Sequence, residues 1–181
     1  MRTIVCIAAA TTLLCGMFAE MATAQLSPVR VRLPGYNLPL SLDSAAGPSE
    51  TMAASFEVTR AAAVTVLEEL KISATTNDPA GLVGNGGFTL LRSLGSDRLS
   101  KYFDCGVGLS GPQADAWRLT VAVMLWVERA GNDSSRVRMA LVAGARDLDA
   151  SARRYTGCGS TGVLETVVIN RIRERVSSPT P

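Results

Sequence analysis

The chain has 181 residues, of which 18 are basic, 16 are acidic and 47% are hydrophobic. This length suits a single globular domain, and a net charge of +2 gives no reason to expect nucleic acid as a partner. The sequence contains no histidine. Ser-His-Asp and Cys-His catalysis and histidine-ligated metal sites are therefore excluded, and we predict neither a cofactor nor a metal.

Residues 1–24 have the pattern of a secretory signal peptide. A basic start is followed by an apolar stretch over residues 4–18, and Ala22 and Ala24 are small residues of the kind that signal peptidase recognises. The apolar stretch is shorter than the roughly 20 residues of a transmembrane helix, and the residues before Cys15 do not suit lipid attachment. We predict cleavage after Ala24, no transmembrane segment in the mature chain, and an exported protein that is periplasmic or secreted. A membrane anchor and a lipoprotein are the alternatives.

Two of the four cysteines, Cys105 and Cys158, lie beyond the predicted signal peptide. An even number of cysteines in an oxidising compartment predicts a disulfide between them. A reactive or metal-binding pair is the alternative. It is disfavoured because the two are not in a C-x-x-C arrangement and no histidine or further cysteine completes a site.

The mature chain divides into a leader, one domain and a tail. Residues 25–50 contain four prolines and are predicted to form an extended leader, with one short edge-strand candidate over residues 29–33. Residues 51–176 are predicted to form a single α+β domain, and residues 177–181 a disordered tail.

The first half of the domain shows one helix and several short strands. Residues 52–58 are predicted to lead from a strand into a helix with Thr59 as its N-cap and an apolar face that includes Val66 and Leu67. Residues 82–91 suit a hairpin strand whose glycines mark a bulge. A short helix is expected over residues 98–104.

The second half shows two long strands and a closing helix. Residues 117–127 and 135–146 alternate between apolar and mixed positions, so we expect an antiparallel hairpin covered mainly on one side. Residues 147–159 are predicted to be a loop, and the apolar repeat within residues 163–176 predicts an amphipathic helix. The predicted fold is an antiparallel sheet of about four to five strands, with two helices on one face and one disulfide.

The segments Leu67-Glu68-Glu69-Leu70-Lys71-Ile72 and Asp78-Pro79-Ala80-Gly81-Leu82-Val83, with the element order after them, resemble the opening of helix-grip-type domains. Such domains occur in accessory lipoproteins of outer-membrane protein assembly in bacteria. The resemblance implies a helix-grip-like fold and a bacterial envelope setting. It carries over no functional residue, and this chain departs from that family by lacking a convincing lipid-attachment cysteine.

Arginine and tryptophan share the mixed face of the two long strands. Arg118, Arg136 and Arg138 with Trp126 are therefore our candidate binding face. Acid–base chemistry without histidine needs paired carboxylates, for which the candidates are Glu68, Glu69, Asp97, Asp104, Asp147 and Asp149.

We predict a non-enzymatic exported envelope protein that acts as a binding or assembly-accessory module, with an unknown envelope protein as its partner. One alternative is a carrier that holds a small apolar ligand between the sheet and the final helix. The other is a hydrolase that uses two carboxylates. The sequence alone identifies no catalytic residue.

Overall fold

The computed structural model describes residues 27–148 and 154–178. The predicted signal peptide lies outside these residues. The helices are α1 (Phe56–Glu69), α2 (Gln113–Ala116) and α3 (Val163–Ser177). The long strands are β5 (Leu82–Leu91), β11 (Arg118–Arg129), β12 (Ser135–Arg146) and β13 (Tyr155–Ser160). The shorter strands of the same sheet are β3 (Ser49–Met52), β4 (Thr76–Asn77), β6 (Ser93–Leu94), β7 (Asp97–Arg98) and β8 (Phe103–Asp104).

The sheet is antiparallel and is organised around the β11–β12 hairpin. The main strand order is β7-β6-β5-β11-β12-β13-β8, while β3 also pairs with β12 and β4 with β5. The predicted hairpin is confirmed, and so is the irregularity in β5, where the register against β11 shifts between Val121 and Val123. The α+β class is confirmed, but the sheet has more strands than predicted, and the described residues contain a further helix, α2, that was not predicted.

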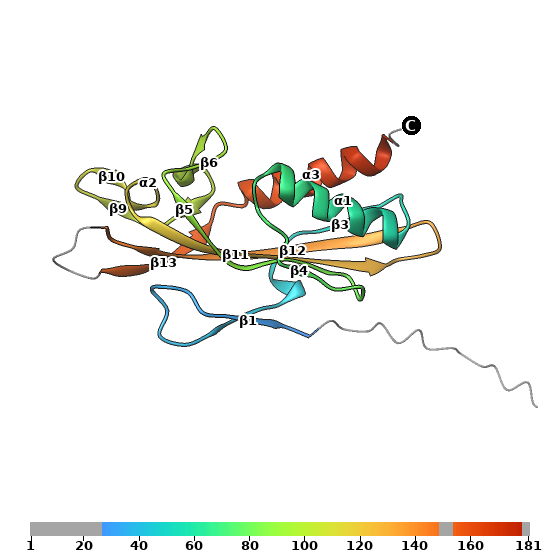
Figure 1. Cartoon of the computed structure of the whole chain (residues 1–181), viewed down its shortest axis with the longest axis horizontal. Helices are drawn as coiled ribbons and strands as arrows, with labels where there is room; N and C mark the ends of the chain where they lie inside the picture. The colour runs from blue at the N-terminus through green and yellow to red at the C-terminus, as the bar shows by residue number, and fades with distance from the viewer. Residues whose placement is uncertain (1–26, 149–153, 179–181) are drawn as a thin grey trace, which may run out of the picture.

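Helices α1 and α3 lie side by side on one face of the sheet, as Figure 1 shows. Val66 and Leu67 of α1 and the predicted stripe of α3 are fully buried in one core with the odd-numbered residues of β11 and β12. The stripe consists of Leu164, Val168 and Ile172. The apolar periodicity of both helices is therefore explained by one shared core. Among the described residues, no helix has the length and apolar character needed to span a bilayer.

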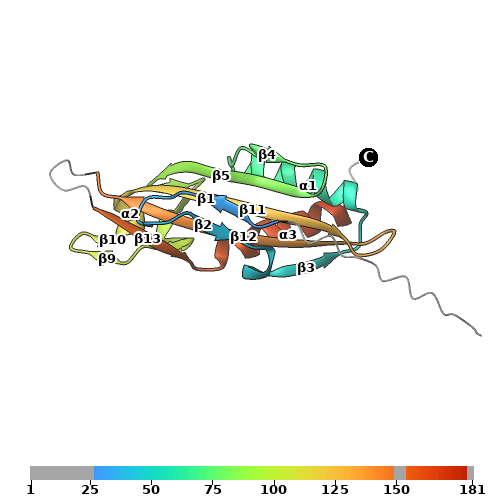
Figure 2. The same ribbon diagram turned by 90° about the horizontal axis from the view of Figure 1, so that it is seen from below.

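The opposite face of the sheet is not open, which corrects our prediction. Strands β1 (Val29–Val31) and β2 (Leu40–Leu42) form an antiparallel hairpin that lies across this face, as Figure 2 shows from below. Val31, Leu33 and Leu42 are buried against the even-numbered positions of β11 in a second hydrophobic cluster. The predicted leader therefore belongs to the folded domain, because its apolar alternation finds a sheet surface to cover. We call the face of the sheet on which the β1–β2 hairpin lies the hairpin face.

Two glycines let the hairpin approach the sheet closely. A side chain at Gly144 of β12 would place its Cβ 1.8 Å from the carbonyl oxygen of Pro34. Gly35 has φ +85°, and a Cβ there would lie 2.3 Å from the carbonyl oxygen of Thr156. The β1–β2 loop therefore seats on β12 and β13 only because both positions lack a side chain.

Three local predictions were wrong. Part of residues 147–159 is strand β13, not loop, because Tyr155 to Cys158 pair with the end of β12. Residues 98–104 hold strand segments and a 3₁₀ turn (Leu99–Lys101) instead of a helix. Thr59 is not an N-cap. It lies in the buried face of α1, where its hydroxyl accepts a hydrogen bond from Ser135, and α1 begins after Ser55.

Candidate binding surface at the disulfide end of the sheet

Trp126 does not lie on an exposed binding face, because it is fully buried beneath the β1–β2 hairpin. Among the described residues its buried indole nitrogen has no hydrogen-bond partner, and neither has Nε of Arg138, which stands directly opposite it on β12. Arg138 is half-buried and pairs with Glu128 at 3.8 Å. These two residues are therefore part of the packing between hairpin and sheet.

Arg118 and Arg136 lie at opposite ends of the hairpin face. Arg136 stands opposite Glu128, ten positions along β11 from Arg118. At about 3.3 Å per strand residue the two Cα atoms are roughly 30 Å apart. The four predicted residues therefore do not form one surface.

The structure gives Arg118 different neighbours. Arg118 stands directly opposite Leu91 of β5 on one side and Arg146 of β12 on the other, and Arg146 stands opposite Tyr155 of β13. Residues directly opposite one another share a face, so all four side chains project from the hairpin face. All four residues are exposed, and we call them the terminal row. In Figure 1 the β1–β2 hairpin ends short of this end of the sheet.

Within the described part of the chain, no carboxylate neutralises the two arginines of the terminal row. Among the described residues, neither Arg118 nor Arg146 makes an ion pair or a side-chain hydrogen bond, whereas nearby Arg154 pairs with Asp147 at 3.7 Å. Like charges directly opposite one another on a sheet destabilise it. The electrostatic interaction between these two arginines therefore opposes the fold.

Exposed apolar side chains gather around the same end. Among the described residues, seven large hydrophobic side chains are exposed, and only Val58 belongs to the other end of the sheet. Leu91 and Tyr155 belong to the terminal row. The rest are Leu38 in the hairpin loop, Val107 and Leu109 at the β9–β10 turn, and Leu148 after β12. Val107 is 79% exposed and Leu109 is fully exposed. Clustered apolar exposure is typical of interaction sites.

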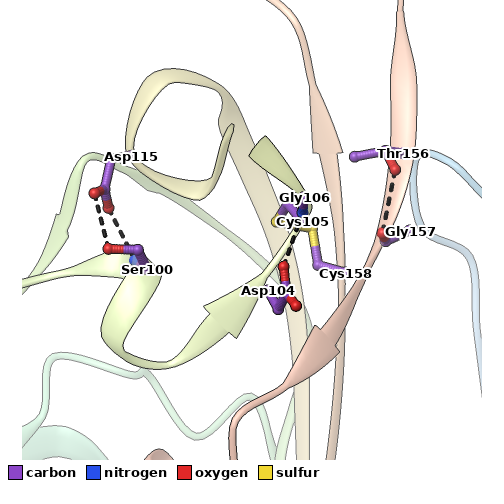
Figure 3. The surroundings of a disulfide bond; sticks show 8 residues. All are labelled: Ser100, Asp104, Cys105, Gly106, Asp115, Thr156, Gly157 and Cys158. Atoms are coloured by element: carbon purple, nitrogen blue, oxygen red, sulfur yellow. Dashed lines mark hydrogen bonds between the residues drawn. A yellow bond between two sulfur atoms is a disulfide. The ribbon is translucent and has the colours of Figure 1, made fainter. Parts of the chain in front are cut away.

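The predicted disulfide between Cys105 and Cys158 is present (Figure 3), and Cys158 lies three positions along β13 from Tyr155 of the terminal row. Cys158 lies in β13, and Cys105 directly follows β8. The next segments are β9 (Val107–Gly108) and β10 (Gly111–Pro112), whose turn carries Leu109. The disulfide therefore attaches the base of this exposed apolar turn to the edge of the sheet.

Side-chain hydrogen bonds support the same segment. Asp115 of α2 accepts bonds of 2.8 Å from both the backbone N–H and the hydroxyl of Ser100, and Asp104 accepts one of 2.9 Å from the Gly106 N–H. The exposed turn therefore extends from a well-anchored base.

Tyr36 connects the hairpin to the disulfide strand. Its ring packs over Gly157, where a Cβ would come within 2.7 Å of it. Burial raises the pKa of Tyr36, and a hydrogen bond with the Cys158 backbone partly offsets the rise. A hollow of about 340 Å³ lies beside it, lined by residues 33–37 and Tyr155. The β1–β2 loop therefore stands above the sheet beside the terminal row, and we call this change of level the step.

The candidate carboxylates belong to separate structural contacts. Glu69 pairs with Arg175, Asp147 with Arg154, and Asp104 caps the turn at Gly106. Lys101 and Tyr102 donate hydrogen bonds to Asp97, and these lower its pKa. Burial, with the bond to Asp97, raises the pKa of Tyr102 to about 12. Glu68 is exposed on α1, and Asp149 lies outside the described residues. No metal-binding group of three or more such residues occurs within the described part of the chain.

Sequence reasoning missed Leu91, Arg146 and Tyr155. The position of Arg146 could have been predicted. Arg118 and Arg146 lie equally far in sequence from Asn132 at the centre of the hairpin loop, and residues so placed stand opposite each other in a regular hairpin. Tyr155 had no such signal, since its segment was predicted to be a loop.

No protein family model, no curated protein and no solved structure matches this chain.

Proposed function

We propose that this protein is a non-enzymatic, exported binding or assembly-accessory module that contacts a partner protein through the disulfide end of its sheet. The observation that carries the proposal is that six of the seven exposed large hydrophobic side chains among the described residues lie at the disulfide end of the sheet, in the terminal row, in the hairpin loop, after β12 and at the β9–β10 turn on the helix side. Interfaces favour Tyr, Arg and apolar side chains, and a monomer rarely exposes a large apolar patch without a function.

The chemistry of the chain supports a binding role. The absence of histidine removes the commonest general base, and four of the six candidate carboxylates, Glu69, Asp97, Asp104 and Asp147, are engaged in structural contacts on different elements. The space between the sheet and α3 is filled by Leu164, Val168 and Ile172, which favours a solid core over a ligand cavity.

Export and an envelope location belong to the same proposal. The pattern of residues 1–24 and the disulfide support them, because disulfides persist in oxidising compartments. The resemblance to helix-grip-type domains also supports a bacterial envelope setting.

Site-specific photo-crosslinking in the producing cells tests the binding surface. A photoreactive amino acid replaces Leu109 in one variant and Val58, an exposed apolar residue at the other end of the sheet, in the control. We expect a discrete adduct with one protein from position 109 and none from position 58. Equal adduct patterns at the two positions, or no adduct at position 109, would refute the proposed surface.

Intact-mass measurement of the extracted protein tests export. We expect a chain that begins at Gln25 and gains two hydrogens on reduction. A chain that retains residues 1–24 would contradict export by a cleaved signal peptide.

A further inference from the structure

We propose that the terminal row binds an acidic segment of the partner polypeptide, with Arg118 and Arg146 as its carboxylate receptors. The inference rests on the proposed function and identifies the chemistry of the partner. It starts from two guanidinium groups that the sheet register holds next to each other. Directly opposite strand residues have Cα atoms only about 5 Å apart.

The direct pairing of two arginines across neighbouring strands indicates what the row binds. Among the described residues, no carboxylate pairs with either arginine, which is also true of exposed arginines such as Arg30 and Arg32. Arg118 and Arg146, however, stand directly opposite each other on neighbouring strands. A carboxylate placed between the two guanidiniums would neutralise their repulsion and accept bidentate hydrogen bonds. Arginine is suited to this geometry because its donors form a planar fork.

The two ends of the row fit a polypeptide. Leu91 and Tyr155 flank the arginines, so apolar and aromatic surface lies on both sides of the charged centre. Tyrosine and arginine are the residue types that carry much of the energy at protein interfaces. Three inter-strand spacings make the row about 14 Å wide, which an extended segment of four or five residues crosses.

The shape of the surface favours a polypeptide over an anionic bilayer. The row lies beside the step formed by the hairpin loop, where a hollow of about 340 Å³ separates residues 33–37 from Tyr155. A flat bilayer would meet the outward side of the hairpin first. Arg30 and Arg32 are exposed there, because the alternating Val31 and Leu33 face the sheet.

Binding of defined probes to the purified mature protein tests the inference. The acidic probe is a labelled ten-residue peptide in which Glu alternates with Leu, Val and Tyr, and the neutral probe has Gln in place of Glu. Vesicles with 30% phosphatidylglycerol in phosphatidylcholine test the membrane alternative. The variant is Arg118→Gln/Arg146→Gln. The control is Arg30→Gln/Arg32→Gln, which removes the same charge from exposed arginines of the same side.

We expect the acidic peptide to bind the wild type, and the Gln peptide to bind at least tenfold more weakly. Arg118→Gln/Arg146→Gln should weaken binding of the acidic peptide at least tenfold, while the control changes it less than twofold. Equal weakening by both variants would show non-specific attraction and overturn the inference. Binding to the anionic vesicles without binding to the peptide would also overturn it, in favour of a membrane surface.

Crosslinking separates this inference from the proposed function. If position 109 still yields its discrete adduct in the Arg118→Gln/Arg146→Gln background at the wild-type level, the arginines do not receive the partner. The inference then fails while the proposed binding module stands. If position 109 yields no adduct even in the wild type, the proposed function fails.

Discussion

The two ends of the β11–β12 hairpin use arginine in different ways. At the turn end, Glu57 pairs with Arg60 at 3.6 Å and with Arg129 at 3.5 Å, and Arg129 also lies 4.2 Å above the ring of Phe56. At the disulfide end, Arg118 and Arg146 face each other without a partner among the described residues. Glu57 therefore neutralises two arginines at the turn end, whereas Arg136 at the same end makes no ion pair among the described residues. The disulfide end leaves its charges and its apolar side chains available to another molecule.

The same contrast extends to covalent structure. The turn end closes through a short loop and the buried hydrogen bond of 2.7 Å between Ser135 and Thr59. The disulfide end carries the exposed β9–β10 turn, whose base is fixed by Cys105 and Cys158. We expect the disulfide to stabilise the end that the apolar core reaches least.

Removal of the disulfide is the largest expected effect. Its cysteines are 53 residues apart, and closing a loop of this length is worth about 4 kcal/mol in the chain-entropy account. Cys105→Ser/Cys158→Ser should lower the free energy of unfolding by roughly that amount, as measured by urea denaturation. An unchanged denaturation midpoint under reducing conditions would show that the bond adds no stability.

The β1–β2 hairpin is expected to contribute nearly as much to the free energy of unfolding. Leu42 is buried against the sheet and Leu38 is 77% exposed in the same hairpin, so the two leucines form a matched pair. Leu42→Ala should cost about 3 kcal/mol and shift the fluorescence of Trp126 to longer wavelength, while Leu38→Ala should change stability by less than about 0.5 kcal/mol. If both substitutions had the same small effect, the hairpin would not be part of the folded core.

A smaller effect is expected at the turn end. Ser135→Ala leaves the buried hydroxyl of Thr59 without its partner, which should cost about 1–3 kcal/mol. Thr59→Val combined with Ser135→Ala removes both polar groups and should recover part of the loss. Urea denaturation of Ser135→Ala and of the double variant measures the two losses. If the double variant lost as much stability as Ser135→Ala, or more, the result would speak against the hydrogen bond.

The contribution of Tyr102 to the free energy of unfolding should be lost at high pH. Because its pKa is raised to about 12 in the folded state, its contribution is complete below pH 10 and declines as the pH rises towards 12. Tyr102→Phe should therefore lose less stability than the wild type over this range, and one phenolate transition near pH 12 should disappear from the absorbance titration. If the variant and the wild type had parallel profiles above pH 10, Tyr102 would not be perturbed.

Periodicity predicted the elements whose side chains alternate between core and solvent. Strands β11 and β12 and helix α3 are of this kind. Strand β13 was missed because Tyr155 to Ser160 is rich in glycine and has no apolar alternation. It becomes a strand by pairing with β12 and by the disulfide. The β1–β2 hairpin was predicted to be an extended leader because the prolines of residues 25–50 argued more strongly against regular structure than the short apolar alternation argued for it. Its role becomes visible only from the sheet face that it covers.

The candidate site was predicted in part. The disulfide of Cys105 and Cys158 is confirmed, Arg118 stays a prediction as a binding residue, and Trp126 was assigned to the wrong environment. Residue parity correctly placed Trp126 and Arg118 on the same face, yet it carries no information on which length of that face another segment covers. The pairing of Arg118 with Arg146 follows from hairpin register, whereas the position of Tyr155 depends on a strand that local sequence does not encode.

The stability of Arg118→Gln, Arg146→Gln and the double variant tests the central claim most directly, since it needs no knowledge of the partner. If the two arginines face each other without a counter-charge, each single substitution should leave the free energy of unfolding unchanged or raise it by up to about 0.5 kcal/mol. Added salt should reduce any gain, because it screens the repulsion. A loss of more than about 1 kcal/mol in either single variant would show that the arginines serve the fold, and would contradict a binding surface at this end of the sheet.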